Sequence, residues 1–201
     1  MPIFLDQIKN HNLKYRSFLE DKTVAIIGPA SSVLFEENGD EIDKYDVLIR
    51  INRGSELVDD KKEFVGSRTD VLYNSLDFDP LSGGNLSAIK NSNIKFICCP
   101  YSVKEKTFSD KIFEKNDQPS LFSEFSIRFI EDKSYFSAKE KTNSRINSGF
   151  GAIIDILNQP VKKVYITGID FYRSVYCEGY NLNRKWGSDY KKIEEDLEFK
   201  I

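Results

Sequence analysis

The chain has 201 residues, of which 40% are hydrophobic and 30% charged, with a formal net charge of −3. These values are typical of one globular domain that buries its own core, as soluble proteins do. Since no general basic field is present, the charge argues against a nucleic-acid-binding protein. With His11 as the single histidine and no C-x-x-C among three cysteines, the sequence excludes a histidine-built metal site and argues against structural zinc.

Five short apolar runs alternate with polar or helix-like segments. Each run is continuously apolar, which is typical of parallel strands covered on both faces. Helices are predicted over residues 6–22 and 149–158, the second capped by Asn147 and Ser148. This order predicts an α/β fold with a single Rossmann-like, doubly wound, mostly parallel sheet, in one domain over residues 1–201. The predicted strands are residues 23–27, 46–51, 69–73, 94–99 and 163–167.

Two regions are less regular. Residues 101–144 are rich in Lys, Phe, Ser and Glu without a clean period, and we place one or two helices there without assigning their limits. The first 22 residues hold no apolar run long enough for a signal peptide or a membrane span. We therefore expect the protein in the cytoplasm.

Small or amide residues follow most of the predicted strands. In an open parallel sheet, ligands bind beyond the carboxyl ends of the strands. Each such residue alone is an ordinary turn former, but together they predict a polar ligand such as a nucleotide. Residues 28–32 read Gly-Pro-Ala-Ser-Ser, which is not G-x-G-x-x-G, and no P-loop sequence occurs, so a dinucleotide cofactor or a P-loop ATPase is not expected. The strand-end residues are Gly28, Ser31, Asn52, Asn74 and Gly168.

Several segments resemble conserved motifs of the sialyltransferases. Residues 145–149 (Arg-Ile-Asn-Ser-Gly) and 167–172 (Thr-Gly-Ile-Asp-Phe-Tyr) are similar to the bacterial enzymes. Residues 66–70 (Gly-Ser-Arg-Thr-Asp) resemble the first motif region of the animal Golgi enzymes. The resemblance covers roughly residues 23–75 and 145–199. Further agreement lies in residues 27–31 (Ile-Gly-Pro-Ala-Ser), 50–52 (Arg-Ile-Asn) and 73–75 (Tyr-Asn-Ser).

The resemblance implies a fold and a reaction. The fold would be the single-Rossmann, GT-A-variant type with a small lid near residues 173–190. The reaction would be inverting and metal-independent, with no cofactor, and would move sialic acid from a CMP-sugar donor to a hydroxyl of a glycan acceptor. A lipid-linked acceptor would add peripheral contact with a membrane. Two alternatives stay open: a transferase of CMP-Kdo or another CMP-activated acid sugar, and a non-catalytic nucleotide- or glycan-binding Rossmann protein.

Departure of CMP needs stabilisation of charge on a phosphate oxygen, for which hydroxyl groups are suitable donors. In the resembling family, two tyrosines after the last strand contact this phosphate. Tyr172 corresponds to the first, and Tyr176 or Tyr180 to the second. Aromatic packing under a lid is the alternative interpretation of these residues.

The same likeness assigns other binding residues. Asn52 and Asn74 would hold phosphate and sugar groups, while Ser148 and Gly149 open a helix whose amides suit an anion. Asp170 would bind the ribose or the base edge, or cap its loop. The remaining candidates for the donor are Gly28, Pro29, Ser31, Ser32, Ser75, Asn147, Gly168, Ile169, Phe171 and Tyr180, and those for the acceptor are Arg145, which can also be a solvated surface residue, and Trp186.

One motif departs from the family. Bacterial relatives have a Gly-His pair before a helix that ends in Leu-Glu-Phe, and that histidine is the general base. Here Gly187-Ser188 precedes residues 197–199 (Leu-Glu-Phe), so Ser188 occupies the histidine position. Serine is a good helix cap but a poor base near neutral pH. Either the serine replaces a natural histidine, or the natural protein lacks this base and Asp189 substitutes or no turnover occurs.

Overall fold

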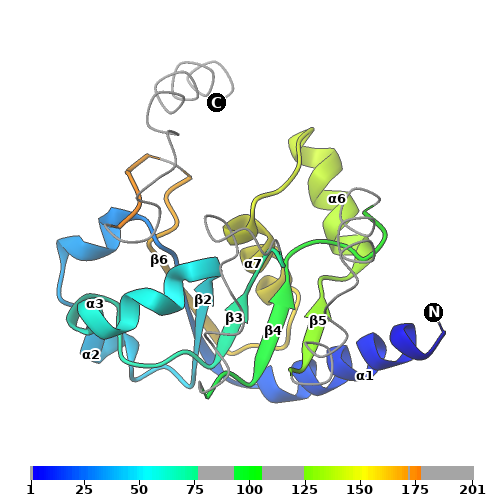
Figure 1. The fold of residues 1–201 in the computed structure, drawn as a ribbon, viewed down its shortest axis with the longest axis horizontal. Helices are drawn as coiled ribbons and strands as arrows, with labels where there is room; N and C mark the ends of the chain where they lie inside the picture. The colour runs from blue at the N-terminus through cyan, green and yellow to red at the C-terminus, as the bar shows by residue number, and fades with distance from the viewer. Residues whose placement is uncertain (1, 77–92, 106–124, 172, 178–201) are drawn as a thin grey trace.

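The computed structural model describes residues 2–76, 93–105, 125–171 and 173–177. Its centre is a six-stranded sheet of order β5-β4-β3-β2-β1-β6, in which every neighbouring pair is parallel (Figure 1). The fold is therefore α/β with a parallel sheet, as the sequence predicts. The strands are β1 (Thr23–Ile27), β2 (Val47–Ile51), β3 (Val71–Tyr73), β4 (Phe96–Cys99), β5 (Ile127–Phe129) and β6 (Lys163–Thr167).

Helices connect and flank these strands. Two short 3-10 helices lie at the strand ends where the sequence predicts turns: η1 begins shortly after β1, and η2 begins directly after β2. Within the described residues, none of the helices combines the length and apolar character that a bilayer crossing requires. The helices are α1 (Pro2–Leu19), η1 (Ser31–Phe35), α2 (Gly39–Ile42), η2 (Asn52–Leu57), α3 (Val58–Val65), α6 (Asp132–Thr142) and α7 (Ser148–Leu157).

The predicted elements differ from the observed ones mainly at their ends. The bounds of β1 and β6 are confirmed, while β2, β3 and β4 begin one or two residues later than predicted. The helix expected over residues 6–22 is α1, which starts and ends earlier. The short strand β5 was not predicted, because its central residue is an arginine. The predicted lid at residues 173–190 stays a prediction, since only residues 173–177 of it are described.

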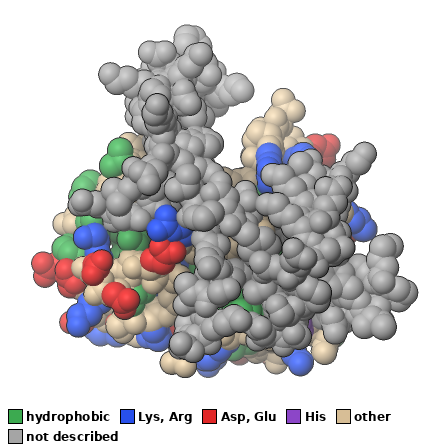
Figure 2. All heavy atoms as spheres, viewed as in Figure 1, with side chains coloured by type: hydrophobic (Ala, Val, Ile, Leu, Met, Phe, Trp, Pro, Cys, Tyr) green, Lys and Arg blue, Asp and Glu red, His purple; other side chains and the backbone are tan. Residues whose placement is uncertain are grey.

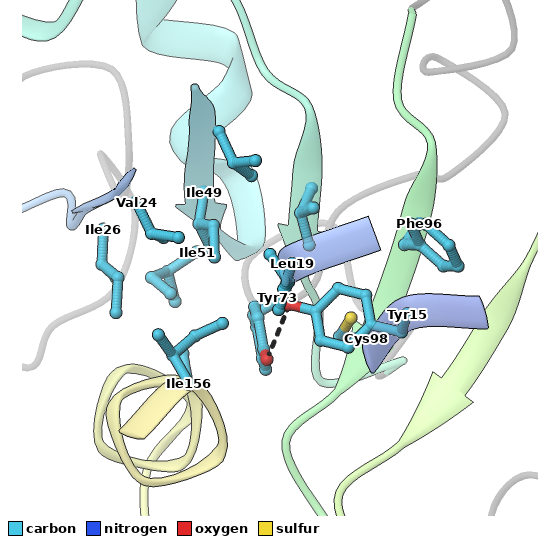
Figure 3. Packing of buried hydrophobic residues seen from close by; sticks show 13 residues of the cluster. Tyr15, Leu19, Val24, Ile26, Ile49, Ile51, Tyr73, Phe96, Cys98 and Ile156 are labelled. Carbon is cyan, nitrogen blue, oxygen red and sulfur yellow. Dashed lines mark hydrogen bonds between the residues drawn. The ribbon is translucent and has the colours of Figure 1, made fainter. Parts of the chain in front are cut away.

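Alternate strand residues pack against opposite layers, with α7 and α3 on opposite sides of the sheet (Figure 1). On one side, Tyr15 and Leu19 of α1 and Ile156 of α7 pack on the strands (Figure 3). On the other side, α2 and α3 cover β1 and β2. Figure 2 shows charged side chains of both signs over α2 and α3, so this surface is not a basic patch.

A buried polar network fixes α7 to the strands beneath it. Arg128 of β5 forms an ion pair with Asp155 of α7, and both side chains are almost fully buried. The Tyr73 hydroxyl donates to Asp155 Oδ2 at 2.5 Å and lies 3.1 Å from the Tyr15 hydroxyl (Figure 3). Since Asp155 compensates its charge, Arg128 can occupy a buried strand.

The strand order places the reversal of the chain between β1 and β6. Strands β2 to β5 are added one after another on one side of β1. After α6 and α7, the chain adds β6 on the other side of β1. In open parallel sheets, the crevice for a ligand forms at such a switch point, outside the carboxyl ends of the strands.

Candidate functional site

A cleft of about 200 Å³ opens at this switch point. Its walls come from the segments that follow β1, β2, β4 and β6 and from the first turn of α7. The sequence places these segments far apart, and only the sheet brings them together. The residues that line the cleft are Pro29, Ala30, Ile51, Asn52, Tyr101, Asn147, Ser148, Gly149, Gly168, Ile169, Asp170, Phe171, Ser174 and Tyr176.

Gly28 and Gly168 bring the ends of β1 and β6 together beside the cleft, which Gly168 lines and Gly28 does not. A Cβ atom on Gly28 would lie 2.1 Å from the Gly168 carbonyl oxygen, and one on Gly168 would lie 2.4 Å from the Gly28 carbonyl oxygen. Gly168 also has a φ of +64°, in the region that side chains disfavour. The Gly28 amide donates to the Thr167 carbonyl oxygen at 2.8 Å. Glycine is therefore required at both positions, because the backbones that follow β1 and β6 are in direct contact there and leave no space for a Cβ atom.

Asn52 joins three elements at the mouth of the cleft. It has a φ of +48°, a conformation that asparagine tolerates better than most residues. Its Oδ1 accepts from the Ser75 amide at 2.9 Å, and its Nδ2 lies 3.4 Å from Ser148 Oγ. Asn52 thus ties the end of β2 to the end of β3 and to the start of α7.

The first turn of α7 faces the cleft. Asn147 caps the helix, since its Oδ1 accepts from the Phe150 amide at 2.8 Å, which confirms the predicted cap. Gly149 lets the turn approach the segment after β6, because a Cβ there would lie 3.3 Å from Ile169 Cγ2. The amides and dipole of a helix N-terminus favour a negatively charged group. This turn therefore gives the cleft a preference for an anion.

Residues 168–171 and 173–177 contribute the outer wall of the cleft. Asp170 accepts hydrogen bonds from the hydroxyls of Ser32 and Ser174 through its Oδ2. The ring of Phe171 is half exposed and packs edge-on against Phe150, with a centroid distance of 6.1 Å. Tyr176 lies opposite Ala30 in an antiparallel bridge and contributes to the lining of the cleft.

Some predicted donor residues lie outside this lining. Asn74 is buried. Its backbone amide donates to the Cys98 carbonyl oxygen, and its side-chain Oδ1 accepts from the Leu76 backbone amide. The side-chain oxygen of Asn74 is therefore used within its own loop, and Asn74 does not line the cleft. Ser75 and Ser32 are also outside the lining but donate to the lining residues Asn52 and Asp170. The Ser31 amide donates to the Val175 carbonyl oxygen, next to the lining residues Ser174 and Tyr176.

The predicted acceptor residue Arg145 is exposed, and its guanidinium lies over the ring of Tyr101, 4.6 Å from the centroid. Tyr101 itself lines the cleft and was not predicted as a site residue, nor were Ala30, Ile51 and Ser174. The signal for Tyr101 was its place directly after a predicted strand. The candidates Tyr172, Tyr180, Trp186 and Ser188 lie outside the described residues.

Neither a cysteine nucleophile nor a preformed metal cluster emerges from the described residues. Burial raises the pKa of Cys98 to about 11 and also raises the pKa values of Cys99 and Cys177. These thiols are therefore protonated and unreactive near neutral pH. In the same part of the chain, no group of three or more His, Cys, Asp or Glu side chains could hold a metal ion.

Comparison with known proteins identifies the fold. No protein-family model matches the chain, and no curated protein matches it by sequence. Among solved structures, the sialyltransferase CstII from Campylobacter jejuni in complex with cytidine-5'-monophosphate is similar, with 17% identity and a TM-score of 0.59 over 88% of this chain and 77% of that one. CstII with a trisaccharide acceptor and CMP has 19% identity and a TM-score of 0.54 over 85% and 71%.

A mammalian sialyltransferase in complex with Gal-beta-1-3GalNAc-ortho-nitrophenol is similar too. It has 14% identity and a TM-score of 0.55, over 90% of this chain and 69% of that one. At such identities the likeness concerns the fold. The chain therefore has the sialyltransferase fold, as its motifs predict.

Proposed function

We propose that the protein is a CMP-sugar-dependent glycosyltransferase that moves sialic acid, or a related acid sugar, to a hydroxyl of a glycan. The observation that carries this proposal is the cleft at the β1–β6 switch point, which combines a helix N-terminus with Asn52 and Tyr176. Such a site suits one phosphate group and a hydroxyl-rich ligand. The structural neighbours that were solved with CMP and with acceptor sugars support the same class of substrates.

The proposed chemistry is a direct displacement with inversion. The acceptor oxygen forms a bond to the anomeric carbon, the bond from that carbon to the phosphate oxygen breaks, and CMP leaves with the electron pair. Tyr176 and Tyr172 donate hydrogen bonds to the phosphate as its charge develops. Of the two candidates for the second tyrosine, we favour Tyr176, because it lines the cleft.

The proton of the acceptor hydroxyl requires a base, and here the sequence has Ser188 at the position expected for a histidine. A positioned general base contributes about 10² to 10⁴-fold in rate. We therefore expect this chain to bind its donor and to transfer it slowly. The serine favours one second candidate function, a protein that binds a CMP-sugar or glycan without turnover.

We propose that no metal is needed, since the helix N-terminus and hydroxyl groups can stabilise the leaving phosphate. The sequence does hold one Asp-x-Asp triplet, Asp77-Phe78-Asp79, which follows β3 and lies outside the described residues. Two carboxylates at this spacing are suitable ligands for a divalent cation. Metal independence therefore has to be measured directly.

The first experiment is calorimetric titration with CMP, CDP, UDP and ATP, each with and without EDTA. We expect CMP to bind more tightly than UDP or ATP and to bind equally with EDTA. Preference for UDP would contradict the proposal of a CMP-sugar site, and loss of CMP binding in EDTA would contradict metal independence.

The second experiment compares the chain with its Ser188→His variant in a transfer assay over a pH series, using CMP-sialic acid, CMP-Kdo and a galactose-terminated acceptor. An imidazole titrates near neutral pH and can take the acceptor proton, so we expect the variant to be at least about 10²-fold faster. Full activity of the serine form would assign the base to Asp189 or another group. If both forms bind CMP but neither transfers a sugar, the binding function is correct.

A further inference from the structure

Asp170 is at the centre of a hydrogen-bonded group that we call the clasp, formed by Ser32, Asp170 and Ser174. The Ser32 hydroxyl donates to Asp170 Oδ2 at 3.1 Å, and the Ser174 hydroxyl donates to the same oxygen. Ser32 belongs to η1, and Asp170 follows β6. One carboxylate oxygen thus joins η1, which follows β1, to Ser174, which follows β6.

The clasp stands next to a short backbone ribbon that carries Tyr176. The Ser31 amide donates to the Val175 carbonyl oxygen at 2.7 Å, and the Cys177 amide donates to the Pro29 carbonyl oxygen at 2.8 Å. Between them, Tyr176 pairs with Ala30 in an antiparallel bridge. Residues 175–177 are therefore held to residues 29–31 by two backbone hydrogen bonds, beside the clasp.

The pairing of residues 175–177 with residues 29–31 is short, and without further contacts these two segments would separate easily. Backbone hydrogen bonds make small net contributions to stability, whereas hydrogen bonds to a charged group contribute roughly twice as much. At one end of the pairing Val175 is 70% exposed, whereas at the other end Cys177 is buried in the core beside β1. The carboxylate of Asp170 therefore supports the exposed part of this wall, where apolar burial adds little.

We propose that Asp170 is a positioning residue: it fastens the segment that carries Tyr176 through the two serines, and so fixes the Tyr176 hydroxyl toward the phosphate of the nucleotide. The part of this proposal that concerns the phosphate rests on the proposed function; the part that concerns the wall does not. The alternative is that Asp170 acts directly on the ligand, by binding the ribose or the base.

The wall is tested without a ligand, by amide hydrogen exchange at Ser31 and Cys177. We expect Asp170→Ala, and the double variant Ser32→Ala with Ser174→Ala, to exchange roughly tenfold faster at both amides, which corresponds to about 1.4 kcal/mol of local stability. Amides of β1 should exchange at unchanged rates. Ser174→Thr keeps a hydroxyl and should retain slow exchange, and Ser67→Ala, an exposed serine at the other end of the sheet, is the matched control.

The effect on the ligand is tested by CMP titration of the same variants. We expect the double serine variant to weaken CMP binding as much as Asp170→Ala, with no further loss when the two are combined, because all three residues act as one unit. In a Tyr176→Phe background, neither change should weaken CMP binding any further. A merely structural contribution would instead lower CMP affinity equally in both backgrounds.

Two results would overturn the proposal. If exchange at Ser31 and Cys177 is unchanged in Asp170→Ala, the clasp does not hold the wall. If Asp170→Ala weakens CMP binding while the double serine variant does not, Asp170 is a direct ligand of the nucleotide. If the unaltered protein binds no CMP, the proposed function fails, whereas the exchange rates still decide whether the clasp fastens residues 175–177.

Discussion

Polar side chains gather at both ends of the sheet, but they have different tasks there. At the amino ends of the strands, Arg68 donates to the carbonyl oxygens of Asp43 and Tyr45 and to the carboxylate of Asp70. Asp70 Oδ2 in turn accepts from the Leu48 amide at 2.9 Å. These groups satisfy one another. At the carboxyl ends, Asn52 and Ser148 also contact each other, but there they line a cleft.

The difference shows how far a motif can be interpreted. Residues 66–70, which resemble the first motif region of the animal enzymes, lie at the amino end and fasten loops. Arg50, in another matching segment, is also structural: its guanidinium is buried and donates to three carbonyl oxygens, those of Val65, Gly66 and Arg68. A segment that resembles a family motif can therefore hold the fold together without lining the cleft. The predictions that follow contrast the two ends.

The largest effect is expected beside the cleft, from Gly28→Ala. The new methyl group would lie 2.1 Å from the Gly168 carbonyl oxygen, so β1 and β6 must separate. We expect a loss of about 3 kcal/mol in the free energy of unfolding and loss of CMP binding. Urea denaturation and calorimetry measure these quantities. Gly54→Ala is the control, because a Cβ there meets only Arg50 Cβ, at 3.7 Å; equal effects at both glycines would contradict the close contact.

At the amino end, Arg68→Met should affect stability alone. It removes three hydrogen bonds from a charged donor and leaves their acceptors without that partner, which we expect to cost about 2 kcal/mol in the free energy of unfolding. CMP affinity, measured at a temperature where the variant is folded, should be unchanged. Weaker CMP binding in the folded variant would show that the two ends are coupled.

The opposite pattern is expected for Asn52→Asp. Aspartate keeps the acceptor for the Ser75 amide and tolerates the positive φ, so the free energy of unfolding should change by less than about 1 kcal/mol. The added negative charge repels a phosphate in the cleft, and we expect CMP affinity to fall at least roughly tenfold, or about 1.4 kcal/mol. Unchanged affinity in calorimetry would place the phosphate away from Asn52.

The smallest effect concerns the pH dependence of stability at the amino end. Hydrogen bonds from the backbone amide and then the hydroxyl of Thr23 lower the pKa of Asp46 below its ordinary value of 3.8. This stabilisation is present above that value and is lost as the pH falls through the lowered pKa. Thr23→Val should raise the pKa of Asp46 part of the way back, as measured by NMR titration, because the amide bond remains. An unchanged pKa would show that the hydroxyl does not contribute.

The sequence by itself determined the parallel sheet and the location of its crevice segments. The apolar runs over residues 23–27 and 163–167 predicted two strands with their observed bounds. Of these, β1 is buried, whereas β6 lies at the edge of the sheet and is partly exposed. The cap at Asn147 and the glycines at 28 and 168 are likewise local signals, because backbone geometry requires those residue types. The motifs built from them also predicted the fold that the solved structures show.

Only the tertiary structure decided which polar residues form the site. Strand β5 exists because Asp155, 27 residues away, compensates the buried charge of Arg128. Asn52 lines the cleft, whereas Asn74 is buried and its Oδ1 accepts from the Leu76 amide of its own loop. Asp170 accepts a hydrogen bond from Ser32, which is 138 residues away in the sequence. Such pairings depend on strand order and on charge compensation across the fold, which no local pattern of residues encodes.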